Sequence, residues 1–145
     1  VFVDAIRREQ PDVIFTHNPE DYHLDHIAVS KLVVDGTFLS TVPSYRPQSQ
    51  AVSTMPQIYF METYSGIGFQ PTEYVDITQE MELKLEMMGC HSSQIKWMME
   101  HDKVDILDFL KVSGKYRGYQ CGTVYGECFR RYLTALRAVP GNFLP

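Results

Sequence analysis

An α/β layered fold is the class that the sequence predicts, because short apolar strands alternate with helices along the chain. The run Val13–Phe15 is short, apolar and made of β-branched and aromatic residues, as in a central strand of a parallel sheet. A helical pattern extends from about Asp25 to Leu39, and a polar, histidine-rich loop precedes it. This order places the loop at the carboxyl end of a strand, where ligands bind in open α/β sheets.

The other elements follow from the same apolar spacings and turn residues. Residues 3–9 suit the end of an amphipathic helix, which Pro11 breaks. Strands are expected at 58–64, at 73–77 and at the start of the tail 122–136, and helices at 77–88, 94–102 and 104–116. Asp76 is expected to cap the helix after it, and Gly89 to end that helix.

The stretch 40–57 is expected to be a long loop. It contains three prolines and many Ser, Thr and Gln residues. A loop of this length in a compact domain is either a binding loop or lid, or a poorly ordered segment.

The composition is that of a globular domain with a core. The chain has 145 residues, of which 44% are hydrophobic and 21% charged, and its net charge is −5 at pH 7. This charge and the lack of a basic stripe argue against nucleic-acid binding, and no apolar run approaches the roughly 20 residues of a membrane span. The three cysteines lack paired short spacings, so we expect neither a disulfide scaffold nor a four-cysteine zinc site. A reducing, cytoplasmic setting is the expectation.

The loop "THNPEDYHLDH" (16–26) concentrates groups that bind metals and transfer protons. If a helix starts near Leu24, His23 and His26 lie on neighbouring positions of its first turn. Asp25 can hydrogen-bond a neighbouring imidazole, and zinc accepts imidazole and carboxylate ligands. His17 either caps the strand end or lines the cleft. On these residues alone a metal or acid/base site and a structural role stay equally open, since acidic residues also compensate a helix N-terminus.

The remaining histidines, thiols and methionines are expected to be structural. No comparable spacing of histidines and aspartates surrounds His91 or His101. Buried, unreactive thiols are expected for the cysteines, and a core-filling role for a methionine group. These residues are Cys90, Cys121, Cys128, Met87, Met88, Met98 and Met99.

The sequence resembles the LmbE-like, or PIG-L, family of zinc-dependent N-deacetylases. The stretch "PDVIFTHNPEDYHLDHIA" (11–28) resembles the family's second signature, in which a P-x-D-x-H-x-D-H-x-A pattern follows P-D-V-[VI]-[FL]-T-H. Looser matches follow in the family's order: "EYVDIT" (73–78), "CHSSQ" (90–94) and "YGECF" (125–129). The resemblance implies a Rossmann-like three-layer fold with a mostly parallel sheet.

The resemblance also implies an activity and residue roles. It implies hydrolysis of an acetamide on an N-acetylglucosamine-type sugar conjugate, with Zn²⁺ or another divalent metal as cofactor. His26 matches the zinc ligand, His23 the catalytic histidine and Asp25 the aspartate that supports a catalytic histidine. Leu24 replaces the usual proline, at a position that supplies backbone rather than chemistry.

One family signature is missing from the chain. The motif A-H-P-D-D-E, which supplies two further zinc ligands and the general base, does not occur in these 145 residues. We therefore expect residues 1–145 to be the C-terminal part of a single deacetylase domain, incomplete at the N-terminus and inactive alone. A sheet without its first strands has an unprotected edge, which invites association into a homo-oligomer.

Two alternatives remain beside this interpretation. A metallo-β-lactamase-like hydrolase carries H-x-H-x-D-H, but here Asp21 stands where the first histidine should be. A non-catalytic sugar-binding or interaction module would use the nine tyrosines, Trp97 and the proline-rich loop to stack on sugar rings. For the deacetylase the expected partner is a small-molecule N-acetylated sugar conjugate, and substrate specificity is expected in loops such as 40–57.

Overall fold

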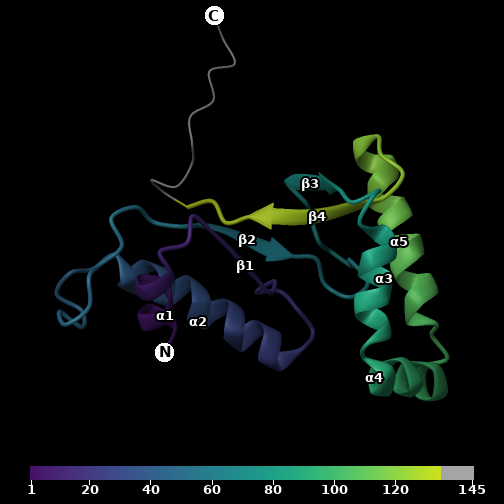
Figure 1. Cartoon of the computed structure of the whole chain (residues 1–145), viewed down its shortest axis with the longest axis horizontal. Helices are drawn as coiled ribbons and strands as arrows, with labels where there is room; N and C mark the ends of the chain where they lie inside the picture. The colour runs from purple at the N-terminus through teal and green to yellow at the C-terminus, as the bar shows by residue number, and fades with distance from the viewer. Residues whose placement is uncertain (135–145) are drawn as a thin grey trace, which may run out of the picture. The chain divides into compact units, whose positions relative to one another are not determined.

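The computed structural model describes residues 1–134, which divide into two units. The first unit contains residues 1–72 and 129–134, and the second contains residues 73–128. In chain order the elements are α1 (Phe2–Glu9), β1 (Val13–Thr16), α2 (Leu24–Ser40), β2 (Gln57–Met61), β3 (Glu73–Asp76), α3 (Met81–Gly89), α4 (Ser92–Trp97), the π-helical turn η1 (Met98–Asp102), α5 (Ile106–Cys121) and β4 (Gly126–Arg131) (Figure 1).

The sheet of the first unit is mixed. β1 pairs with β2 in parallel, with Ile14 opposite Ile58, because α2 carries the chain back between them. β2 pairs with the end of β4 in the antiparallel sense, with Tyr59 opposite Arg131. The predicted α/β class is therefore confirmed, while the expected mostly parallel sheet combines one parallel and one antiparallel pairing here.

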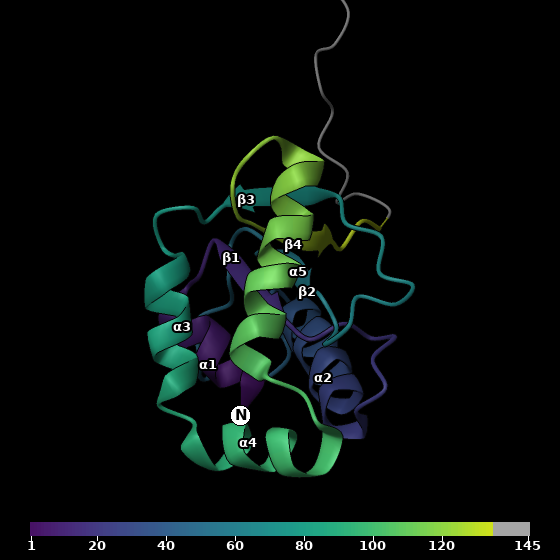
Figure 2. The same cartoon turned by 90° about the vertical axis from the view of Figure 1, so that its right-hand side faces the viewer.

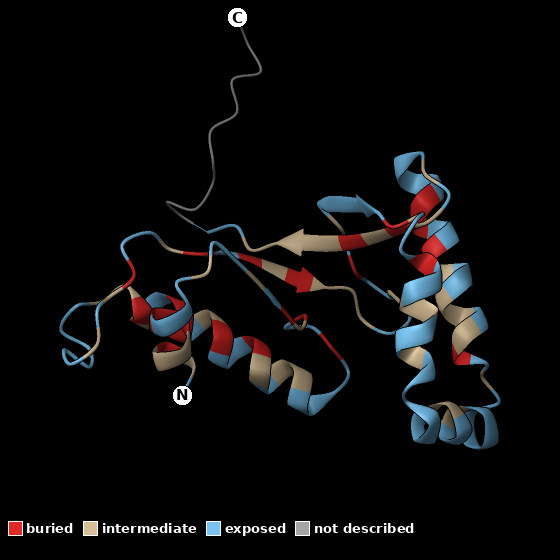
Figure 3. Ribbon diagram, viewed as in Figure 1, coloured by how far each residue is buried: buried red, intermediate tan, exposed pale blue. Residues whose placement is uncertain are grey.

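Helices α1 and α2 lie on the same side of β1 and β2 (Figure 1). The buried side of α2 repeats every three to four residues, as Figure 3 shows in red, at Ser30, Val33, Thr37 and Ser40. A side chain at Gly36 would bring its Cβ within 3.1 Å of the Phe2 Cβ, so glycine permits α1 to approach closely. This contact explains a glycine in a helix that it would otherwise weaken.

Arg7 anchors the long loop after α2. Its side chain is only 4% exposed. It donates to the Ser40 and Val42 carbonyls at 3.0 and 2.7 Å, and to the Arg46 and Ser49 carbonyls at 2.9 Å each. The predicted loop between α2 and β2 is therefore tied to α1 by one buried cation.

The second unit consists of helices beside a short pair of strands. α3 packs against α5, α4 and η1 connect them at one end, and β3 lies next to β4 (Figure 2). Asp105 caps α5, because its carboxylate accepts hydrogen bonds from Leu107 and Asp108 backbone N–H groups at 3.0 and 3.2 Å. Met81 is the most deeply buried apolar side chain of this unit.

Several expectations about single residues are wrong. Asp76 does not cap α3: its carboxylate accepts from the Thr78 N–H at 2.9 Å in a local turn, and α3 begins only at Met81. Cys128 is buried as expected, but the structure exposes Cys90 and Cys121. Among the expected core methionines, the structure exposes Met87 and Met99.

The last predicted helix and the predicted tail strand both occur, with shifted ends. The helix expected at 104–116 extends to Cys121, and the tail strand occupies Gly126–Arg131. The end of that predicted tail, residues 135–136, lies outside the described residues. Within residues 1–134, no helix combines the length and apolar character needed to cross a bilayer.

Candidate metal centre

The histidine-rich loop joins the end of β1 to the start of α2 in the first unit. β1 ends at Thr16 and α2 begins at Leu24, so the loop follows the carboxyl end of a parallel strand, as the sequence predicts. His23 is the N-cap residue and has extended backbone angles, φ −89° and ψ 119°. Its carbonyl accepts the first helical hydrogen bond, from Ile27 N–H at 3.1 Å. The helix start thereby fixes His26 in the first turn.

Three imidazoles gather at this helix start. The rings of His17 and His26 stack, with centroids 3.8 Å apart and planes 6° apart. The rings of His23 and His26 also stack, at 4.5 Å and 21°. His17 and His26 are partly buried and His23 is exposed. The two histidines that the sequence singled out therefore lie together, and His17 joins them.

Asp21 holds this cluster in place. It is only 9% exposed, and each of its carboxylate oxygens has a partner. Oδ1 accepts from the His23 N–H at 2.9 Å, and Oδ2 lies 2.9 Å from His26 Nδ1. Burial alone would raise the pKa of Asp21, but hydrogen bonds from His23, His26 and Tyr22 together lower it. The ionised carboxylate favours the tautomer with a proton on His26 Nδ1, in which Nε2 is the nitrogen that can bind a metal.

The donor set fits a divalent cation of the zinc type. Ligand atoms of His17, Asp21 and His26 lie within 4.8 Å of one another. Partial burial lowers the pKa of His17, and the neighbouring His26 lowers it further, which favours the neutral ring that metal binding requires. Both Asp21 oxygens already accept hydrogen bonds, so this carboxylate suits the role of orienting His26 better than that of a ligand.

The structure adds residues that the sequence reasoning did not select. Asp25 is exposed, and within residues 1–134 no hydrogen bond joins its carboxylate to an imidazole. Asp21 provides that contact instead, although the sequence interpretation gave it no role in the cluster. Its signal was present: an aspartate two residues before a helix N-cap often bonds the backbone N–H two positions on. The roles implied for His23, Asp25 and His26 stay predictions.

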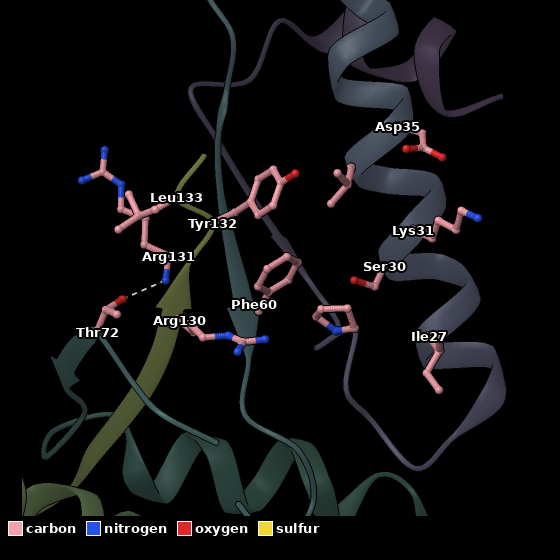
Figure 4. Close-up of a pocket in the computed structure, with 12 residues that line it drawn as sticks. Ile27, Ser30, Lys31, Asp35, Phe60, Thr72, Arg130, Arg131, Tyr132 and Leu133 are labelled. Carbon is pink, nitrogen blue, oxygen red and sulfur yellow. Dashed lines mark hydrogen bonds between the residues drawn. The ribbon is translucent and has the colours of Figure 1, made fainter. Parts of the chain in front are cut away.

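A pocket of about 600 Å³ lies beside the loop in the same unit (Figure 4). Its walls are mostly apolar, with Ile27 from α2 and Phe60 from β2 among them. Arg130 of β4 borders both features, because its guanidinium lies over the Phe60 ring at 5.5 Å and its Nη2 donates to Asn18 Oδ1 at 2.6 Å. No sequence pattern predicted this arginine, since its partner is more than a hundred positions away.

The fold and the loop together define an α/β protein with a candidate metal centre at the carboxyl end of a parallel strand. The resemblance to the LmbE-like, or PIG-L, family is confirmed: the PIG-L family of GlcNAc-PI de-N-acetylases matches residues 1–36, which include the whole histidine loop.

A known relative extends the similarity along the chain. A diacetylchitobiose deacetylase from Thermococcus kodakarensis is 25% identical over 150 aligned positions, which cover 98% of this chain and 50% of the relative. The chain therefore spans about half the length of that relative.

Solved structures share the fold. The N,N'-diacetylchitobiose deacetylase from Pyrococcus horikoshii, in complex with an inhibitor, superposes with a TM-score of 0.73 at 27% identity, covering 90% of this chain and 49% of that protein. A conserved protein from Thermus thermophilus gives 0.76 at 22%, and the 4-carboxy-2-hydroxymuconate hydratase from Pseudomonas putida gives 0.74 at 21%. Each of these two alignments covers 99% of this chain and 60% of the other, and at such identities they show the fold alone.

Proposed function

We propose that this chain is part of a metal-dependent amide hydrolase that removes an acetyl group from an N-acetylglucosamine-type substrate. The observation that carries the proposal is the hydrogen bond between Asp21 and His26 beside two further imidazoles. A carboxylate behind a histidine is the usual support of a metal-ligating imidazole. The similarity to deacetylases named for diacetylchitobiose supports the choice of substrate class.

His26 would hold the metal, with zinc as the expected ion, together with the two ligands that the resemblance places in the A-H-P-D-D-E motif. His26 is the ligand that the family resemblance implies, and His17 stacks against it. A divalent cation held there supplies Lewis-acid chemistry, since it activates water and polarises an amide carbonyl.

The chain's own groups would handle protons and charge. His23 is exposed at the helix start, so its ring can reach a bound substrate. As an imidazolium it would donate a hydrogen bond to the developing oxyanion, or a proton to the leaving amine nitrogen. Asp25 would favour the charged form of His23. The resemblance places the general base in the A-H-P-D-D-E motif, so we assign no base to these 145 residues.

The test uses the full-length parent protein, with metal analysis and a panel of N-acetylglucosamine and diacetylchitobiose. His26→Ala should lose the metal. His23→Ala should keep it and lose turnover by about 10²–10³, the usual cost of removing one oxyanion donor. His101→Ala is the control, because that histidine stacks on Trp97 in the second unit.

The outcomes separate the alternatives. Normal metal content and turnover in both site variants would contradict the assignment. Metal and sugar binding without hydrolysis of any panel member would favour the non-catalytic sugar-binding module. A cytoplasmic location and self-association of the parent protein belong to the same proposal and need separate measurements.

A further inference from the structure

We infer that Arg130 is a positioning residue for the histidine loop, an inference that rests on the proposed metal site. Arg130 comes from β4, far from the loop in sequence. Its Nη2 donates to the Asn18 side-chain oxygen at 2.6 Å, and its Nη1 lies 3.6 Å from a Glu20 carboxylate oxygen. One guanidinium therefore forms a hydrogen bond with Asn18 and an ion pair with Glu20, both in the loop that carries the imidazoles.

The guanidinium itself is held on an aromatic support. It lies over the rings of Phe60 and Phe69 at 5.5 and 5.9 Å, and both phenylalanines are buried. Figure 4 shows the Arg130 side chain reaching from β4 toward α2 below Phe60. Cation–π contact and packing already restrict the arginine side chain, so its hydrogen bonds to the loop cost less additional rotamer entropy.

Asn18 passes this constraint on to the imidazoles. Its side chain is 3% exposed, so its amide oxygen depends on a protein donor. Its backbone carbonyl accepts from the Asp21 N–H at 3.2 Å. Asp21 in turn bonds the His23 N–H and the His26 ring. Hydrogen bonds made by Asn18 and Asp21, through both their side chains and their backbones, thus connect β4 with the candidate metal centre.

The geometry calls for arginine rather than any cation. The planar fork offers separate N–H groups to Asn18 and Glu20 while its face stays on the aromatic rings. A lysine ammonium is a single compact donor, so it cannot reproduce both contacts and the stacking.

The test compares Arg130→Met with Arg131→Met, its neighbour on β4, in the full-length parent protein. Figure 4 shows the Arg131 side chain pointing away from Phe60 and α2, so this variant is a matched control. In the metal-free protein we expect amide hydrogen exchange at Asp21 and His23 to accelerate roughly tenfold in Arg130→Met only, as for the loss of a charge-assisted hydrogen bond. Zinc affinity should fall about 10–100-fold in the same variant, the usual range for outer-shell partners.

Urea unfolding of the metal-free variants separates positioning from simple stabilisation. A purely structural role would lower global stability and leave the zinc dissociation constant of the folded protein unchanged, which would overturn the inference. Equal losses in Arg131→Met would overturn it as well. If Arg130→Met does not fold, Arg130→Lys and Asn18→Ala replace it; both should show the two losses, and wild-type values in both would be decisive against it.

The exchange measurement also keeps this inference distinct from the proposed function. If the wild-type protein binds no zinc, the proposed function fails. Faster exchange at Asp21 and His23 in Arg130→Met would then still support the positioning role, whereas unchanged exchange would overturn it.

Discussion

At the scale of residues, Asp21 decides how the histidine loop is organised. Its two oxygens bond the N–H of the N-cap residue His23 and the ring of His26. The same carboxylate therefore fixes where the helix begins and how the imidazole is turned. Because these bonds favour the ionised form, the pKa of Asp21 stays below its ordinary value despite the burial.

Replacing this carboxylate should weaken metal binding. In Asp21→Asn, the amide can accept with one oxygen only, so His26 loses its acceptor or changes its tautomer. We expect the zinc affinity to fall about 10–100-fold, measured by competition with a chromophoric chelator. Asp25→Asn is the matched control, since Asp25 is exposed. A loss of zinc affinity in Asp25→Asn, with none in Asp21→Asn, would reverse the two roles.

Local sequence patterns predicted one contact of the histidine loop and could not predict two others. The spacing of His23 and His26 predicted their proximity, because three positions in a helix define neighbours. The contact between Asp21 and His26 crosses the helix boundary, where no periodicity applies. The contact between Arg130 and Asn18 depends on strand pairing, and no local pattern carries that information.

At the scale of elements, one buried cation organises the loop between α2 and β2. Arg7 donates to the Leu39 and Ser40 carbonyls at the end of α2 and to three carbonyls of the loop, those of Val42, Arg46 and Ser49. The arginine thereby provides donors for partly buried carbonyls that lie outside helices and strands. This arrangement orders a proline-containing loop that the sequence left as either a binding loop or a poorly ordered one.

Removing that cation should destabilise the first unit. In Arg7→Met the carbonyls lose their donor while the packing volume is largely kept, so we expect a loss of about 2 kcal/mol or more in the free energy of unfolding, measured in urea. Arg8→Met is the control: Arg8 is exposed and forms an ion pair with its neighbour Glu9, so its loss should cost within about 0.5 kcal/mol. Equal costs for the two variants would contradict the anchoring role.

The positions of helices and strands were predicted better than the helix caps and the burial of single side chains. Apolar periodicity placed every helix and strand of residues 1–134 near its observed position. Asp76 was misassigned because a local turn with Thr78 competes with a cap. Exposed Met87 and Cys90 both line a second pocket, of about 660 Å³, in the second unit. Apolar character alone therefore did not predict burial there.

At the scale of the whole molecule, the fold is compatible with more than one reaction and does not determine which one the protein catalyses. The solved structures that share the fold include deacetylase and hydratase enzymes, so activity has to be argued from the site. The α/β class followed from the alternation of strands and helices. The antiparallel pairing of β4 did not, because strand direction depends on connections that the strand's own sequence does not encode.

A calorimetric titration of zinc into the metal-free full-length parent protein is the most direct test of the metal centre. The cluster around His26 should bind about one equivalent of Zn²⁺, His101→Ala should bind the same amount, and His26→Ala should lose this binding. Identical titrations for the wild-type protein and His26→Ala would contradict the claim that these imidazoles form a metal centre.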